Sequence, residues 1–130
     1  MHFRLMAAAS LAIAALVGAD AQAQPKTPPP ACFLSRDWDG WKASPDSRSM
    51  YLRVGVNKIF RLDFSSACPE LQRPNAHLIT KMRGGPWICH PLDIDLLVSD
   101  GGGFAVPCIV RGITPLTAEQ AKALPKPLRP

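Results

Sequence analysis

Histidine is scarce in this chain, with three residues in 130, and the residue patterns of common enzyme classes are missing. His77 and His90 do not form the H-x-x-x-H or H-E-x-x-H arrangement that places two zinc ligands on one helical face. No G-x-S-x-G nucleophile elbow is present, and neither Gly84-Gly85 nor Gly101-Gly102-Gly103 is followed by the Lys-Ser/Thr of a phosphate loop. These absences favour a non-catalytic protein, for which we expect no cofactor and no metal.

Long apolar runs are missing after the first residues. Leu5 to Val17 form one apolar run, and two A-x-A tripeptides follow it at 19–21 and 21–23. This pattern predicts a secretory signal peptide over residues 1–23. Because the run is too short to span a bilayer and no longer one follows, we expect a periplasmic or secreted protein without a transmembrane anchor in its mature chain.

C-x-x-C pairs are also missing, which excludes thioredoxin-like redox chemistry and c-type haem attachment. The intervals between Cys32, Cys68, Cys89 and Cys108 are far longer than those of paired zinc ligands. Four cysteines in an exported chain therefore predict two disulfides. Three pairings are open, and we favour Cys32 with Cys68 and Cys89 with Cys108, because Cys89 and Cys108 flank one predicted hairpin.

Residues 24–30 form a polar, proline-rich leader, which predicts an extended spacer before a single β-rich domain at 31–127. Within that domain, apolar residues alternate with polar ones at 50–54 and again at 60–64. The turn-forming residues Gly55 and Asn57 separate these runs. This pattern predicts an antiparallel hairpin.

A second hairpin is predicted from the alternation at 92–98, the glycine-rich turn at 100–103 and the apolar run at 104–110. Pro107 has no backbone donor, so its strand must lie at a sheet edge or carry a bulge. Shorter strands are expected at 40–44 and 76–82.

The period changes near the C-terminus, where Thr117 and Gln120 have the spacing of a capping box and Pro125 ends a short helix over 118–124. The predicted fold class is mainly β. It consists of a small antiparallel sheet or partly closed barrel of about six strands, with one short C-terminal helix and two disulfides.

Several segments together resemble a known family. They include the strands Tyr51–Val54 and Ile59–Asp63, the Cys68-Pro69 pair, and the runs Leu92–Leu96 and Pro107–Arg111. In these segments the chain resembles a family of small exported proteobacterial proteins that is catalogued only as a domain of unknown function. The resemblance implies export and a disulfide-bearing β-rich domain, and it implies no activity or catalytic residue.

Two groups of charged residues are candidates for a site. Asp93 and Asp95 stand two residues apart on a predicted strand, so their carboxylates would share a face. With His90 or His77 they define the alternative hypothesis, a metal-binding or hydrolytic periplasmic protein.

The second group is basic. The chain has 15 Lys and Arg against 10 Asp and Glu, and Arg53, Arg61 and Arg111 are the candidate anion-binding residues. Outside the cytoplasm the expected partner is an anionic envelope component or an envelope protein, and not nucleic acid, for which no motif is present. The sequence thus favours a non-catalytic binding or structural module of the bacterial cell envelope.

Overall fold

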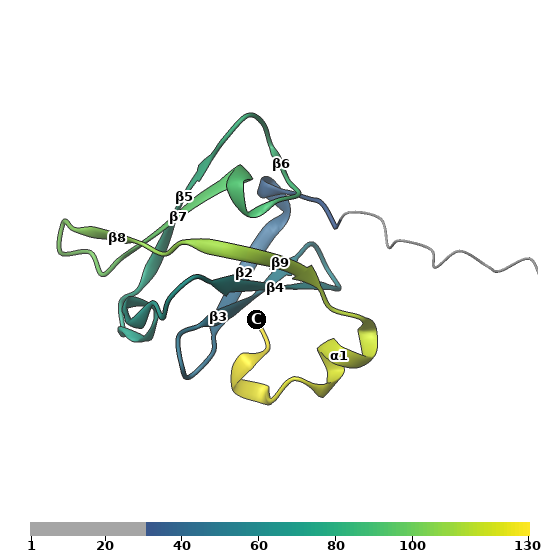
Figure 1. Ribbon diagram of the computed structural model, residues 1–130. Helices are drawn as coiled ribbons and strands as arrows, with labels where there is room; N and C mark the ends of the chain where they lie inside the picture. The colour runs from purple at the N-terminus through teal and green to yellow at the C-terminus, as the bar shows by residue number, and fades with distance from the viewer. Residues whose placement is uncertain (1–30) are drawn as a thin grey trace, which may run out of the picture.

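The structure is a computed structural model that describes residues 31–130, so the predicted signal peptide and leader lie outside the described residues. The described part forms nine strands in three antiparallel sheets that are not closed, and one short α-helix near the C-terminus (Figure 1). The predicted mainly β fold class is confirmed. Nine strands replace the expected six or so. Two of the additional strands have only two residues and show no alternation, and the third arises because the run predicted as one strand at 104–110 is divided, with a separate strand at Val110–Pro115.

The larger sheet has the order β2-β3-β4-β9, with β2 at Trp38–Ala43, β3 at Ser49–Val54, β4 at Lys58–Phe64 and β9 at Val110–Pro115. The first predicted hairpin is β3 and β4, in which Leu52 lies opposite Phe60. Gly55 adopts a φ of 61° in its turn, a conformation that glycine takes without steric cost.

The second sheet has the order β5-β7-β8, with β5 at His77–Met82, β7 at Ile94–Ser99 and β8 at Ala105–Pro107. The second predicted hairpin is β7 and β8. Its first strand begins at Ile94 and not at Leu92, because Pro91 starts a 3-10 helix, η3 (Pro91–Asp93), that leaves the Leu92 side chain 79% exposed.

Pro107 lies on the outer strand of this sheet, as predicted. The N–H of Cys108 donates to the carbonyl oxygen of Leu96 at 2.8 Å. Since hydrogen-bonded positions alternate along an antiparallel ladder, the nitrogen of Pro107 faces away from β7. The missing donor therefore costs the sheet nothing.

Consecutive strands β8 and β9 belong to different sheets, so the chain passes from one sheet to the other between Pro107 and Val110 (Figure 1). All three sheets contribute to one core, in which Met50, Leu52, Leu62 and Ile88 have no exposed surface. Burial of such side chains is the main favourable contribution to folding.

The third sheet pairs β1 (Phe33–Leu34) with β6 (Trp87–Ile88) and explains one disulfide. Phe33 lies opposite Ile88, so the next register position places Cys32 opposite Cys89, and these two cysteines are bonded. The second disulfide joins Cys68 to Cys108. The favoured pairing of Cys32 with Cys68 and Cys89 with Cys108 was therefore wrong.

The predicted C-terminal helix is α1 (Ala118–Ala123), and its capping box is confirmed. The Gln120 N–H donates to the Thr117 hydroxyl at 3.2 Å, and the Thr117 N–H donates to the Gln120 side-chain oxygen at 2.9 Å. At the other end, Arg129 donates to the carbonyl oxygens of Lys122 and Leu124, both at 2.8 Å, which satisfies acceptors that a helix end leaves free.

Candidate functional site

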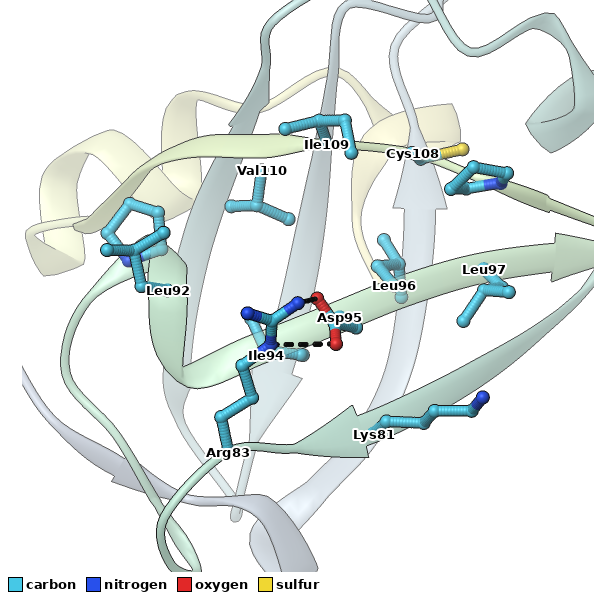
Figure 2. Close-up of a pocket in the computed structure, with 12 residues that line it drawn as sticks. Lys81, Arg83, Leu92, Ile94, Asp95, Leu96, Leu97, Cys108, Ile109 and Val110 are labelled. Carbon is cyan, nitrogen blue, oxygen red and sulfur yellow. Dashed lines mark hydrogen bonds and ion pairs between the residues drawn. The ribbon is translucent and has the colours of Figure 1, made fainter.

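A trough opens where β7 and β9 separate. Strand β8 pairs with β7 only from Leu97 to Ser99, and the chain then turns at Cys108 and joins β4 as β9. The first half of β7 is left with an open edge beside a cavity of about 500 Å3. Figure 2 shows this cavity, here called the β7–β9 trough, bordered by β7, β9 and Leu92 of η3.

Backbone groups of Ile94 and Leu96 point into the trough. The N–H of Arg83 donates to the carbonyl oxygen of Asp93. Because hydrogen-bonded positions alternate along an antiparallel ladder, the backbone groups of Asp95 and Leu97 also point toward β5. Ile94 and Leu96 direct theirs the opposite way. Within residues 31–130, the Leu96 carbonyl bonds to Cys108, whereas the Leu96 N–H and both backbone groups of Ile94 have no hydrogen-bond partner.

The walls of the trough are apolar. Buried side chains of Ile94, Leu96 and Val110 contribute to its lining, and Leu92 and Ile109 stand at its mouth with 79% and 61% of their surface exposed. Large apolar side chains grouped at a concave surface are typical of places where another molecule binds.

The rim over β7 is charged. Arg83 forms a two-point ion pair with Asp95, with nitrogen–oxygen distances of 2.8 and 2.7 Å (Figure 2). This hydrogen bonding lowers the pKa of Asp95 and raises that of Arg83. Lys81 lies beside this pair and forms no ion pair with any residue in 31–130. The rim therefore carries an excess positive charge.

Asp93 and Asp95, the predicted carboxylate pair, have separate roles. Asp93 lies in η3 and not on the predicted strand, and its carboxylate accepts the N–H groups of Cys89 and His90, both at 2.8 Å. These two bonds hold the pKa of Asp93 below its usual value. Each carboxylate is thus engaged with a different part of the chain.

The candidate metal ligands do not converge. His77 lies opposite Ser99, at the far end of β7 from Asp95. In the described part of the chain, the one group of three with metal-ligand spacing is Cys68, Glu70 and Cys108, and its two sulfur atoms are bonded to each other. The donor atoms of His77, His90, Asp93 and Asp95 form no such group within residues 31–130.

The three arginines singled out as anion-binding lie on the four-stranded sheet, and none of them lines the trough. Arg53 donates to the Asp39 carboxylate at 3.0 Å, and Arg61 pairs with Asp63 at 2.8 Å. Arg111 is exposed and occupies the irregularity in register between β4 and β9.

The trough cations Lys81 and Arg83 were not singled out from the sequence. The signal for the trough is the Pro107-Cys108 step, which interrupts the alternation of residues 104–110 and which the sequence interpretation read as part of one strand.

The chain matches the model of one protein family, and that family has no assigned function. Residues 1–129 match the model of a Family of unknown function (DUF6491). The chain belongs to this family. No curated protein and no solved structure matches it. The DUF6491 match confirms the unknown-function part of the resemblance seen in the sequence. Among residues 31–130, no helix is long and apolar enough to cross a membrane.

Proposed function

We propose that this DUF6491 protein is an exported, non-catalytic binding module of the cell envelope and that the β7–β9 trough is its ligand site. The open edge of β7 carries the proposal, because Ile94 and Leu96 present unpaired backbone groups between exposed apolar side chains. A buried backbone group that finds no partner is costly, and a ligand that supplies one gains from satisfying it.

The two disulfides support the assignment to an oxidising compartment, where such bonds form and persist. The positive rim at Lys81 and Arg83 supports an anionic ligand. Arg53 and Arg61 are paired with carboxylates of the same chain, as Arg83 is with Asp95. Lys81 forms no ion pair within residues 31–130, so in this proposal it contributes most of the attraction.

The test is site-specific photo-crosslinking in living cells of the native host. A photoreactive residue replaces Leu92 at the mouth of the trough, and the matched control replaces Val56, which is 86% exposed in the β3–β4 turn on the other sheet. We expect discrete adducts from position 92 and not from position 56. The adducts at position 92 should disappear in the Ile109→Asp variant.

Equal adduct patterns from the two positions, or none from position 92, would show that the trough is not the ligand site. Because the crosslinker reacts with glycans, lipids and proteins alike, the experiment tests the site without assuming the class of ligand.

A further inference from the structure

We propose that the occupant of the β7–β9 trough is a short extended segment of an acidic partner protein, which adds to the edge of β7 as a strand. This inference rests on the proposed function and specifies the class of ligand. It follows from the pattern of free backbone groups, from the two faces of the sheet at this edge, and from the charges on the rim.

The free backbone groups match a peptide. Along the edge of β7 the order is a donor and an acceptor at Ile94, then a donor at Leu96. An extended peptide offers acceptors and donors in alternation with a similar spacing, and adding a strand to an open edge is a common mode of peptide recognition. An acyl chain has no N–H or O–H group that could donate to the Ile94 carbonyl, so it would leave this acceptor without a hydrogen bond.

The two faces of the sheet specify the side chains of the peptide. Successive side chains of an added strand point to opposite faces. On the inner face they would meet the buried side chains of Ile94, Leu96 and Val110, which favours an apolar residue. On the outer face they would meet Asp95 of β7 and, next to it across the β5–β7 ladder, the cations Lys81 and Arg83. These two cations face one carboxylate, so the outer face of the cavity has a net positive charge. A segment that alternates apolar and acidic residues satisfies both faces.

The charge of the chain argues against a second copy of this protein as the partner. The sequence carries a net charge of +5, so two copies repel each other over long range. A polypeptide with acidic side chains is attracted by the same charge. The open edge is also short, since Cys108 already holds the Leu96 carbonyl, so we expect a weak complex with a Kd of about 10 µM to 1 mM.

The probes are two capped synthetic peptides of about eight residues, in which Val alternates with Glu or with Lys. Each is titrated into the isotope-labelled, oxidised protein as isolated from its host, and amide hydrogen exchange is measured residue by residue. We expect the Val/Glu peptide to slow exchange at the amides of Ile94 and Leu96. The amide of Asp95, which faces β5, serves as the internal control.

Two matched variants test the charge. Lys81→Glu should weaken binding of the Val/Glu peptide about 3- to 10-fold and strengthen binding of the Val/Lys peptide, because one attraction becomes a repulsion. Lys58→Glu makes the same charge change on the four-stranded sheet and should leave both affinities within about twofold. A Val/Glu peptide with N-methylated backbone amides should lose binding, because it cannot donate to the Ile94 carbonyl.

The inference is wrong if the Val/Glu peptide fails to protect the two amides, or if N-methylation leaves its affinity unchanged. Should crosslinks at position 92 persist in cells while the peptide fails, the trough binds a ligand of another class, such as a lipid or a glycan. That result would support the trough as the ligand site and contradict the inference that its ligand is a peptide.

Discussion

The backbone N–H of Cys108 donates a 2.8 Å hydrogen bond to the carbonyl oxygen of Leu96, and this is the last hydrogen bond between β7 and the chain that leaves β8. The side chain of Cys108 is bonded to Cys68, just before the 3-10 helix η2 (Pro69–Gln72). One residue thus fixes both the end of the ladder and the beginning of the trough.

We therefore expect the two disulfides to have different local effects. Replacing both Cys68 and Cys108 with Ala should lower the free energy of unfolding by about 2–4 kcal/mol, through the lost constraint on the unfolded chain. It should also accelerate hydrogen exchange at the amide of residue 108. Replacing both Cys32 and Cys89 with Ala should cost a similar amount in urea unfolding without changing exchange at residue 108. Equal exchange in the two variants would contradict this assignment.

Acid should destabilise the protein, partly through Asp93. The N–H groups of Cys89 and His90 lower the pKa of Asp93 in the folded chain below its ordinary value of 3.8. A lowered folded pKa stabilises the fold above the unfolded pKa, and this contribution is lost as the pH falls through the folded pKa. Urea midpoints measured from pH 7 down to pH 2 should decline below about pH 4.

The matched variants for this titration are Asp93→Asn and Asp37→Asn. The first removes the carboxylate that accepts the two N–H groups and should flatten part of the decline below about pH 4. Asp37→Asn makes the same change of charge at a carboxylate that, within residues 31–130, accepts no such pair of backbone N–H groups, and it serves as the control. Identical profiles for the wild type and the Asp93 variant would show that this carboxylate does not contribute.

The core prediction concerns Leu62, whose side chain has no exposed surface on β4. Leu62→Ala should lower the free energy of unfolding by about 2–5 kcal/mol, because it removes buried methyl groups and leaves a cavity. Val56→Ala, at an exposed turn position, should change it by less than about 0.5 kcal/mol. Chemical denaturation of both variants provides the comparison, and a small effect at Leu62 would mean that the site collapses around the smaller side chain.

The helix cap should act locally. Thr117→Ala removes the acceptor of the Gln120 N–H and should cost about 0.5–2 kcal/mol of stability in α1. Faster hydrogen exchange at the Gln120 amide is the direct measurement. Thr114→Ala, an exposed substitution of the same type on β9, should leave that amide unchanged.

The sequence predicted those elements whose signals are local. The alternation of 50–54 and 60–64 about Gly55 defined the β3–β4 hairpin, and the spacing of Thr117 and Gln120 defined the start of α1. In each case a few neighbouring residues determine the structure, because turn and cap preferences act over one or two turns of chain.

The disulfide pairing and the trough depend on contacts between distant segments. Cys32 meets Cys89 because two strands of two residues pair across more than fifty residues of sequence, and strands that short show no alternation. The trough exists because Cys108 directs the chain from one sheet to the other. Apolar residues on both sides of this step look like one continuous strand in the sequence.

Pro107 has a consequence for the protein at high concentration. Its ring nitrogen faces outward from β8, at the place where a neighbouring molecule would need a donor to extend the sheet. Fibril growth by the stacking of one chain on the next requires a continuous row of such donors, and this row is interrupted at the last residue of β8. In a crowded compartment, a single imino acid thus helps to keep the exposed border of this sheet from seeding insoluble aggregates.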